Sequence, residues 1–106
     1  NNYAARRNYN GGADSTVTSV SWAQEGVGLA SENFWVSYIV NISSEEKLTI
    51  SNTVYEKAAG AGTAPDRNEH YAKWAYTSGV ITDITQHEGS AGSYDTNSNL
   101  SAIGSD

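Results

Sequence analysis

Aromatic side chains interleaved with small polar residues are the feature of this sequence most suited to binding. In NFWVSYIVNI, residues 33–42, strict alternation predicts an extended strand, and Trp35 lies on the face that otherwise turns polar. A flat ring bordered by hydroxyl and amide groups suits a sugar, and it equally suits a protein interface. Burial between two sheets is the third explanation, because Trp is highly buried on average. The aromatic set comprises Trp22, Trp35, Trp74, Tyr55, Tyr71 and Tyr76.

A second group of reactive side chains lies in PDRNEHYAKW, residues 65–74. A carboxylate beside a histidine could make a general base or two metal ligands. No second histidine stands at ligand spacing, and a solvated loop that runs into a strand explains the same residues. A small hydrolase that uses Glu69, His70 and Asp83 is therefore the third functional hypothesis, and it requires a bell-shaped pH dependence of activity.

The C-terminal DTNSNLSAIGSD, residues 95–106, resembles part of a calcium loop. Asp95, Asn97 and Asn99 stand at the first, third and fifth positions, where such loops carry oxygen ligands. The sixth position is Leu100 instead of glycine, and no helices are expected on either side. An Asn- and Ser-rich disordered tail explains the same composition, so any calcium binding here is expected to be weak, and no other cofactor is expected.

Composition excludes several functional classes. The net charge is −6 and the six basic residues are scattered, so no patch of them can follow a nucleic-acid backbone. The chain has no cysteine, which removes disulfides, zinc-thiolate sites and thiol nucleophiles. There is no phosphate loop, nucleophile elbow, His-Glu-x-x-His or nucleotide-binding fingerprint. The sequence favours binding over catalysis.

Several features favour an extracellular or surface-exposed location. Ser, Thr and Asn are abundant, and two glycosylation tripeptides occur at Asn41 and Asn99. No apolar run in this sequence approaches the roughly 20 residues that span a bilayer, and we expect no signal peptide within it. The chain starts at Asn1 and has no methionine, so we expect a processed or excised mature segment.

The pattern of turn residues and alternation predicts an all-β fold. We expect a single domain over residues 1–106, an antiparallel β-sandwich or small barrel of about five to seven short strands. An irregular N-terminal arm over 1–13, in which Asn10-Gly11-Gly12 predicts a turn, precedes a β core over 14–86, and a polar tail follows over 87–106. The expected strands cover residues 15–22, 33–42, 47–56, 70–78 and 80–86, with a loop at 23–32 and a long connection at 57–69.

The hairpin formed by residues 33–42 and 47–56 has a predictable register. A loop of three or five residues, an odd number, sets Val36, Tyr38, Val40 and Ile42 beside Leu48, Ile50 and Val54, which matches apolar with apolar side chains. A four-residue loop would match them with polar side chains instead. With the odd loop, Trp35 and Tyr55 become direct or diagonal neighbours on the second face.

These observations lead to three functional hypotheses. The first is a secreted carbohydrate-binding domain whose ligand contacts Trp35 and Tyr55, with Thr53 and Asn41 as polar partners. The alternative is a structural or interaction module, such as a shell, filament, toxin or effector subunit, whose aromatic residues meet a protein surface. An assembly of identical copies belongs to this alternative, and a size that depends on concentration would favour it. The small hydrolase is the third.

Overall fold

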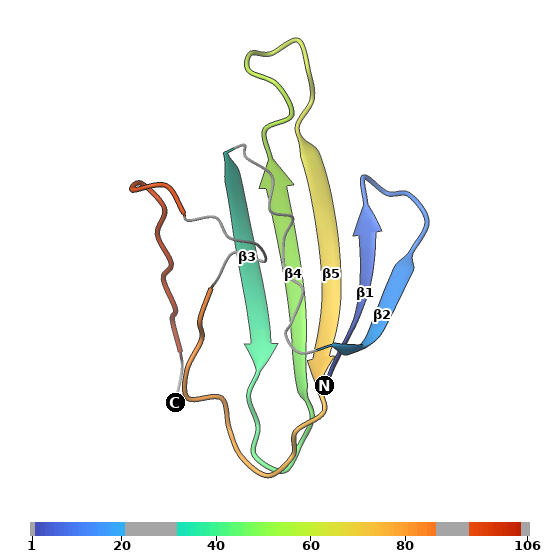
Figure 1. Ribbon diagram of the computed structural model, residues 1–106, viewed down its shortest axis with the longest axis vertical. Helices are drawn as coiled ribbons and strands as arrows, with labels where there is room; N and C mark the ends of the chain where they lie inside the picture. The colour runs from blue at the N-terminus through green and yellow to red at the C-terminus, as the bar shows by residue number, and fades with distance from the viewer. Residues whose placement is uncertain (1, 21–31, 87–93, 105–106) are drawn as a thin grey trace.

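The computed structural model describes residues 2–20, 32–86 and 94–104, and within them the protein is all-β with no helix. Five strands form one antiparallel sheet in the order β2-β1-β5-β4-β3, which does not close into a barrel (Figure 1). The all-β prediction is therefore confirmed. The strands are β1 (Tyr3–Tyr9), β2 (Ser15–Val20), β3 (Asn33–Val40), β4 (Lys47–Tyr55) and β5 (Asp66–Trp74).

The first hairpin corrects one expectation. Residues 3–9 of the supposed irregular arm form β1, which lies between β2 and β5 inside the sheet. The turn predicted at Asn10-Gly11 is present, and both residues adopt positive φ (50° and 74°), as the tight turns that suit β-hairpins require. The amide of Gly12 donates to the carbonyl of Tyr9 and closes this turn. Pairing along its whole length with the distant β5 is what makes β1 a strand.

The hairpin of β3 and β4 has the register expected from the sequence. Tyr38 faces Ile50 and Val40 faces Leu48, so apolar side chains pair with apolar ones. On the opposite side Trp35 faces Thr53, and Asn33 faces Tyr55, which makes Trp35 a diagonal neighbour of Tyr55. The register prediction is confirmed.

The later part of the chain departs from the predicted boundaries. β5 begins at Asp66, so the connection between β4 and β5 is shorter than the predicted loop 57–69, and it projects beyond the sheet (Figure 1). Residues 80–86 form no strand, and the predicted strand there is wrong. This segment instead runs beside the end of β3, where Asn41 and Ile81 exchange two hydrogen bonds. The predicted loop 23–32, except Glu32, and Trp22 lie outside the described residues.

In most sheets the apolar face is buried and the polar face is exposed, and in this sheet the arrangement is reversed. The face that carries alternate, mostly polar residues of β4 and β5 is buried, whereas the opposite face, apolar along β3 and β4 and mostly charged along β5, is exposed. Trp35 lies on the buried face and is itself half-buried. The buried residues on this face are Ala5, Lys47, Ser51, Thr53, Tyr55, Asp66, Asn68, His70 and Ala72. No described helix is long and apolar enough to cross a membrane.

Candidate functional site

The four residues predicted to bind a carbohydrate do not form an open surface. Tyr55 and Thr53 are only 2% and 3% exposed, and Trp35 beside them is half-buried. The Asn41 amide is engaged elsewhere, since its Nδ2 donates to the Ile81 carbonyl and its Oδ1 accepts from the Ile81 amide, at 3.0 and 2.7 Å. The structure brings Trp35, Thr53 and Tyr55 together and places Asn41 away from them, beyond the end of β3. Carbohydrate binding by these residues stays a prediction.

The residues of the hydrolase hypothesis are separated by the pleat of β5. Glu69 and His70 are consecutive strand residues and therefore point to opposite faces. His70 is buried opposite Ser51, whereas Glu69 accepts a hydrogen bond from Arg67 at 3.1 Å on the exposed side. Asp83 lies outside the sheet and accepts from Thr82. The structure does not assemble Glu69, His70 and Asp83 into one reactive group.

The carboxylate of Asp66 is held at the start of β5 by donors from β1 and its turn. The Tyr9 hydroxyl donates to it at 2.8 Å and the Asn10 amide at 2.6 Å, while Lys57 lies 3.7 Å away. The Asn10 amide, and then the Tyr9 hydroxyl, lower the pKa of Asp66. The adjacent Tyr55 hydroxyl, and then the Asp66 carboxylate, raise the pKa of Tyr9. This cluster favours the ionised form of Asp66 and joins the start of β5 to the end of β1 and its turn.

The aromatic residues that the sequence suggested for binding lie in different environments. Trp74 stacks on Tyr3 on one side and on Tyr76 on the other, with ring centroids 5.9 and 4.9 Å apart. This stack fits the interpretation of Trp74 as a packing residue. Tyr71 belongs instead to the exposed face, where it stands opposite Ile50.

The calcium hypothesis concerned Asp95, Asn97 and Asn99. The Asp95 carboxylate accepts hydrogen bonds from the backbone amide of Asn97 at 3.0 Å, from the Asn97 side chain and from the Thr96 hydroxyl. These donors, the Asn97 amide first and the Thr96 hydroxyl second, lower the pKa of Asp95. The arrangement is a local turn in which the side chain caps its own backbone. Within the described ranges, no group of three or more His, Asp or Glu side chains is placed to hold a metal ion.

The sheet also has a large exposed surface that the sequence did not identify as a site. Alternate residues of β3 and β4, together with Tyr71 of β5, leave large apolar side chains in water. Phe34 and Tyr38 are 69% and 68% exposed. We name this surface the apolar face, and it consists of Phe34, Val36, Tyr38, Val40, Leu48, Ile50, Val54 and Tyr71. The apolar pairing used to predict the register was the signal that could have identified it.

The apolar face is hollowed at one end and bordered by paired charges. A shallow cavity of about 360 Å³ lies where Tyr38, Ile50 and Tyr71 stand in one cross-strand row, with Val40 and Leu48 beside them. The adjoining β5 and β1 side of the sheet carries three ion pairs instead of apolar groups. These pairs are Arg67–Glu69, Lys73–Glu46 and Arg6–Asp14, with N–O distances of 3.1, 2.9 and 3.1 Å.

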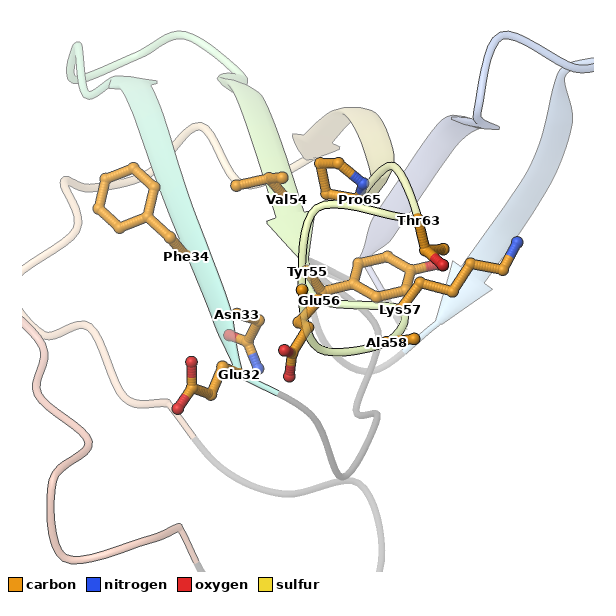
Figure 2. A pocket seen from close by; sticks show the side chains of 11 residues that line it. Glu32, Asn33, Phe34, Val54, Tyr55, Glu56, Lys57, Ala58, Thr63 and Pro65 are labelled. Carbon is orange, nitrogen blue, oxygen red and sulfur yellow. The ribbon is translucent and has the colours of Figure 1, made fainter.

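A second hollow lies at the other end of the sheet, under the connection between β4 and β5. Its volume is about 450 Å³, and we name it the loop hollow. Figure 2 shows the Phe34 ring on one side, the Tyr55 ring under the loop, and the carboxylates of Glu32 and Glu56 near the Asn33 amide. The Tyr55 hydroxyl is buried, and the Tyr55 ring lies beside that of Tyr9. The complete lining is Glu32, Asn33, Phe34, Val54, Tyr55, Glu56, Lys57, Ala58, Gly60, Thr63 and Pro65.

Comparisons with protein-family models, with curated proteins and with solved structures found no match for this chain. The chemistry and geometry of its own residues therefore carry the functional interpretation.

Proposed function

We propose that this protein is a non-catalytic interaction module that binds a protein surface through its apolar face. The observation that carries this proposal is the exposure of eight large apolar side chains on one side of a single sheet. With about 150–250 Å² for a fully exposed aromatic side chain, these residues leave on the order of 700 Å² in contact with water. That exceeds the roughly 300–600 Å² of the largest apolar patch on a typical monomer.

The composition of the surface also supports a protein partner. Aromatic residues are enriched at the centres of protein interfaces, and Phe34, Tyr38 and Tyr71 occupy the apolar face. Charged residues are depleted there and lie at its border, where Arg67–Glu69 and Lys73–Glu46 are already paired. An apolar centre with a polar border is the usual arrangement of a specific interface.

The test measures accessible apolar surface in the folded chain with the fluorescent dye bis-ANS. We expect strong dye fluorescence from the native protein and a clear loss in Leu48→Ser, because Leu48 lies on the apolar face. Ile103→Ser is the matched control, since Ile103 is exposed outside the sheet. Native circular dichroism without dye binding, at a concentration where the protein is monomeric, would reject this function.

Carbohydrate binding is the second proposed function, and the loop hollow is the observation that favours it. Phe34 offers an exposed ring at its edge, and Tyr55 is among the residues that line it. A sugar could stack on the ring and bond to the Glu32, Glu56 and Asn33 side chains. Titration with soluble polysaccharides, followed by amide chemical shifts, should move signals around Phe34 and fail in Phe34→Ala. Shifts that persist in Phe34→Ala would reject this site.

A further inference from the structure

Among the described residues, no layer of secondary structure packs against the apolar face of the sheet. Stable domains pack two layers of secondary structure around an apolar interior, and the described residues supply one sheet. We propose that a second copy of this chain packs against the apolar face, so that each copy contributes one sheet of an intermolecular β-sandwich. This inference rests on the proposed interaction function and names its partner.

The exposed area fits a partner of this size. The apolar face leaves on the order of 700 Å² exposed, and a standard specific interface buries about 800 Å² on each partner. Two sheets that pack face to face lie about 10 Å apart, with their strands roughly aligned. β3 and β4 carry seven of the eight apolar side chains, so the arrangement that buries most apolar area sets these strands of both copies together.

The charge distribution also fits a second copy. The β5 and β1 side of the border carries three basic and three acidic side chains joined in ion pairs, so this side is neutral, although the whole chain has a net charge of −6. Two identical molecules therefore repel each other less through this face than through the rest of the surface. In the packed arrangement the paired charges of β5 remain at the rim, in contact with water.

Asn52 supplies a polar contact near the centre of the face. It is exposed in β4 between Ile50 and Val54, and it stands opposite Val36 of β3 and Glu69 of β5. An amide side chain is both donor and acceptor, so the same group from two copies can pair with itself. A single buried asparagine can select the register of an association in the same way, at a cost in stability. The dimer register in which the two Asn52 side chains meet is therefore favoured over registers in which one sheet is shifted along the other.

The experiment measures molar mass by sedimentation equilibrium from about 1 µM to about 1 mM, which spans weak to moderate dissociation constants. Wild type is expected to pass from monomer to dimer in this range. Tyr38→Glu adds a charge to an exposed side chain and should keep the protein monomeric. Asn52→Asp changes the shape little; it faces Glu69 within each copy and sets two further like charges together when copies meet, so it should weaken the dimer at least tenfold. Ile103→Glu, which lies outside the sheet, should dimerise like wild type.

The outcomes separate this inference from the function on which it rests. A wild-type dimer that Tyr38→Glu dissociates and Ile103→Glu leaves intact supports a second copy. If the wild type is a monomer at every concentration, the proposal that a second copy is the partner is wrong. If that monomer also binds bis-ANS at the apolar face, the proposed interaction function stands and its partner is a different protein. A monomer that does not bind the dye overturns both proposals. A dimer that survives both Tyr38→Glu and Asn52→Asp overturns the proposed face, and native circular dichroism of each variant excludes unfolding as the cause.

Discussion

The Tyr9 hydroxyl donates a hydrogen bond of 2.8 Å to the Asp66 carboxylate, although the two residues are 57 positions apart. Tyr9 ends β1 and Asp66 begins β5, so this bond joins two strands that pair in register next to it. Asn10 strengthens the junction, because its amide donates to Asp66 while its oxygen accepts from the Arg67 amide at 2.9 Å. The junction places the turn after β1 at the start of β5.

The stability of the protein should fall in acid because of Asp66. Asn10 and Tyr9 lower the pKa of this carboxyl group below its ordinary value of 3.8, so folding favours its ionised form. This stabilisation is complete above the unfolded pKa and is lost as the pH falls through the lower folded pKa. Denaturant titrations between about pH 6 and about pH 2 should show it.

Two variants identify the source of that pH dependence. Asp66→Asn should be less stable than wild type at neutral pH, and the difference should shrink below about pH 4. Tyr9→Phe removes one of the donors to Asp66 and should give intermediate behaviour. A stability difference between wild type and Asp66→Asn that is equal at neutral and acid pH would show that Asp66 does not act through its charge.

Lys47 should be the lysine most important for stability among those that the structure describes. It is 1% exposed, and its ammonium group donates to the carbonyls of Glu45 and Tyr76, the second at 3.1 Å. Lys47→Met retains most of the side chain but leaves both carbonyls without this donor. We expect a loss of about 2–3 kcal/mol in the free energy of unfolding, measured by urea denaturation.

Lys73→Met is the matched control for Lys47. Lys73 is also a β-sheet lysine, but its side chain is 47% exposed and pairs with Glu46 on the surface. Exposed pairs of this kind contribute about 0–1 kcal/mol, so the control should cost less than Lys47→Met. Equal losses in the two variants would contradict the role given to the buried ammonium group.

Asn41 should hold residues 80–86 beside β3. Asn41→Ala removes both the donor and the acceptor that face the Ile81 backbone, so the Ile81 amide should exchange its hydrogen faster with solvent. Asn41→Asp keeps the acceptor for that amide and should preserve more of its protection. Hydrogen exchange followed by NMR gives both rates. Unchanged exchange in Asn41→Ala would show that the segment is held by other contacts.

Calcium at Asp95 should compete with an existing turn. The carboxylate already accepts hydrogen bonds from the Asn97 backbone and from Thr96, and calcium would have to replace them. We therefore expect only weak binding, with amide shifts of Asn97 and Asn99 that need millimolar calcium, as in the weakest calcium modules at about 10⁻⁴–10⁻³ M. Asp95→Ala should abolish those shifts. Saturation at micromolar calcium would contradict this assignment.

The local structure of the hairpins follows directly from the sequence. Alternation in residues 33–42 and 47–56 decided which side chains share a face, and apolar matching selected the register that sets Tyr38 opposite Ile50. The Asn10-Gly11 pair predicted a turn, because these residues accept positive φ at low cost. Both conclusions depend on neighbours within about 20 residues, so no knowledge of distant contacts was needed.

Long-range pairing decided what the local pattern could not. Residues 3–9 contain two arginines and two alanines and have no clear apolar alternation, yet they form β1 because β5 offers an adjacent edge. Residues 80–86 have a convincing strand composition but pair with no strand, and Asn41 holds them by a side-chain contact instead. Strand propensity is a weak guide where the partner edge is distant in sequence.

The sequence by itself determined an all-β chain, the register of its central hairpin and the two sets of side chains that alternate along β3 and β4. Only the tertiary structure decided which set is covered. Alternation assigns residues to opposite sides of a strand, but burial depends on what the rest of the chain places against each side. Here the set with Ser51, Thr53 and Tyr55 is covered and the apolar face is open, so the predicted ligand face lies inside and the surface available to a partner lies opposite.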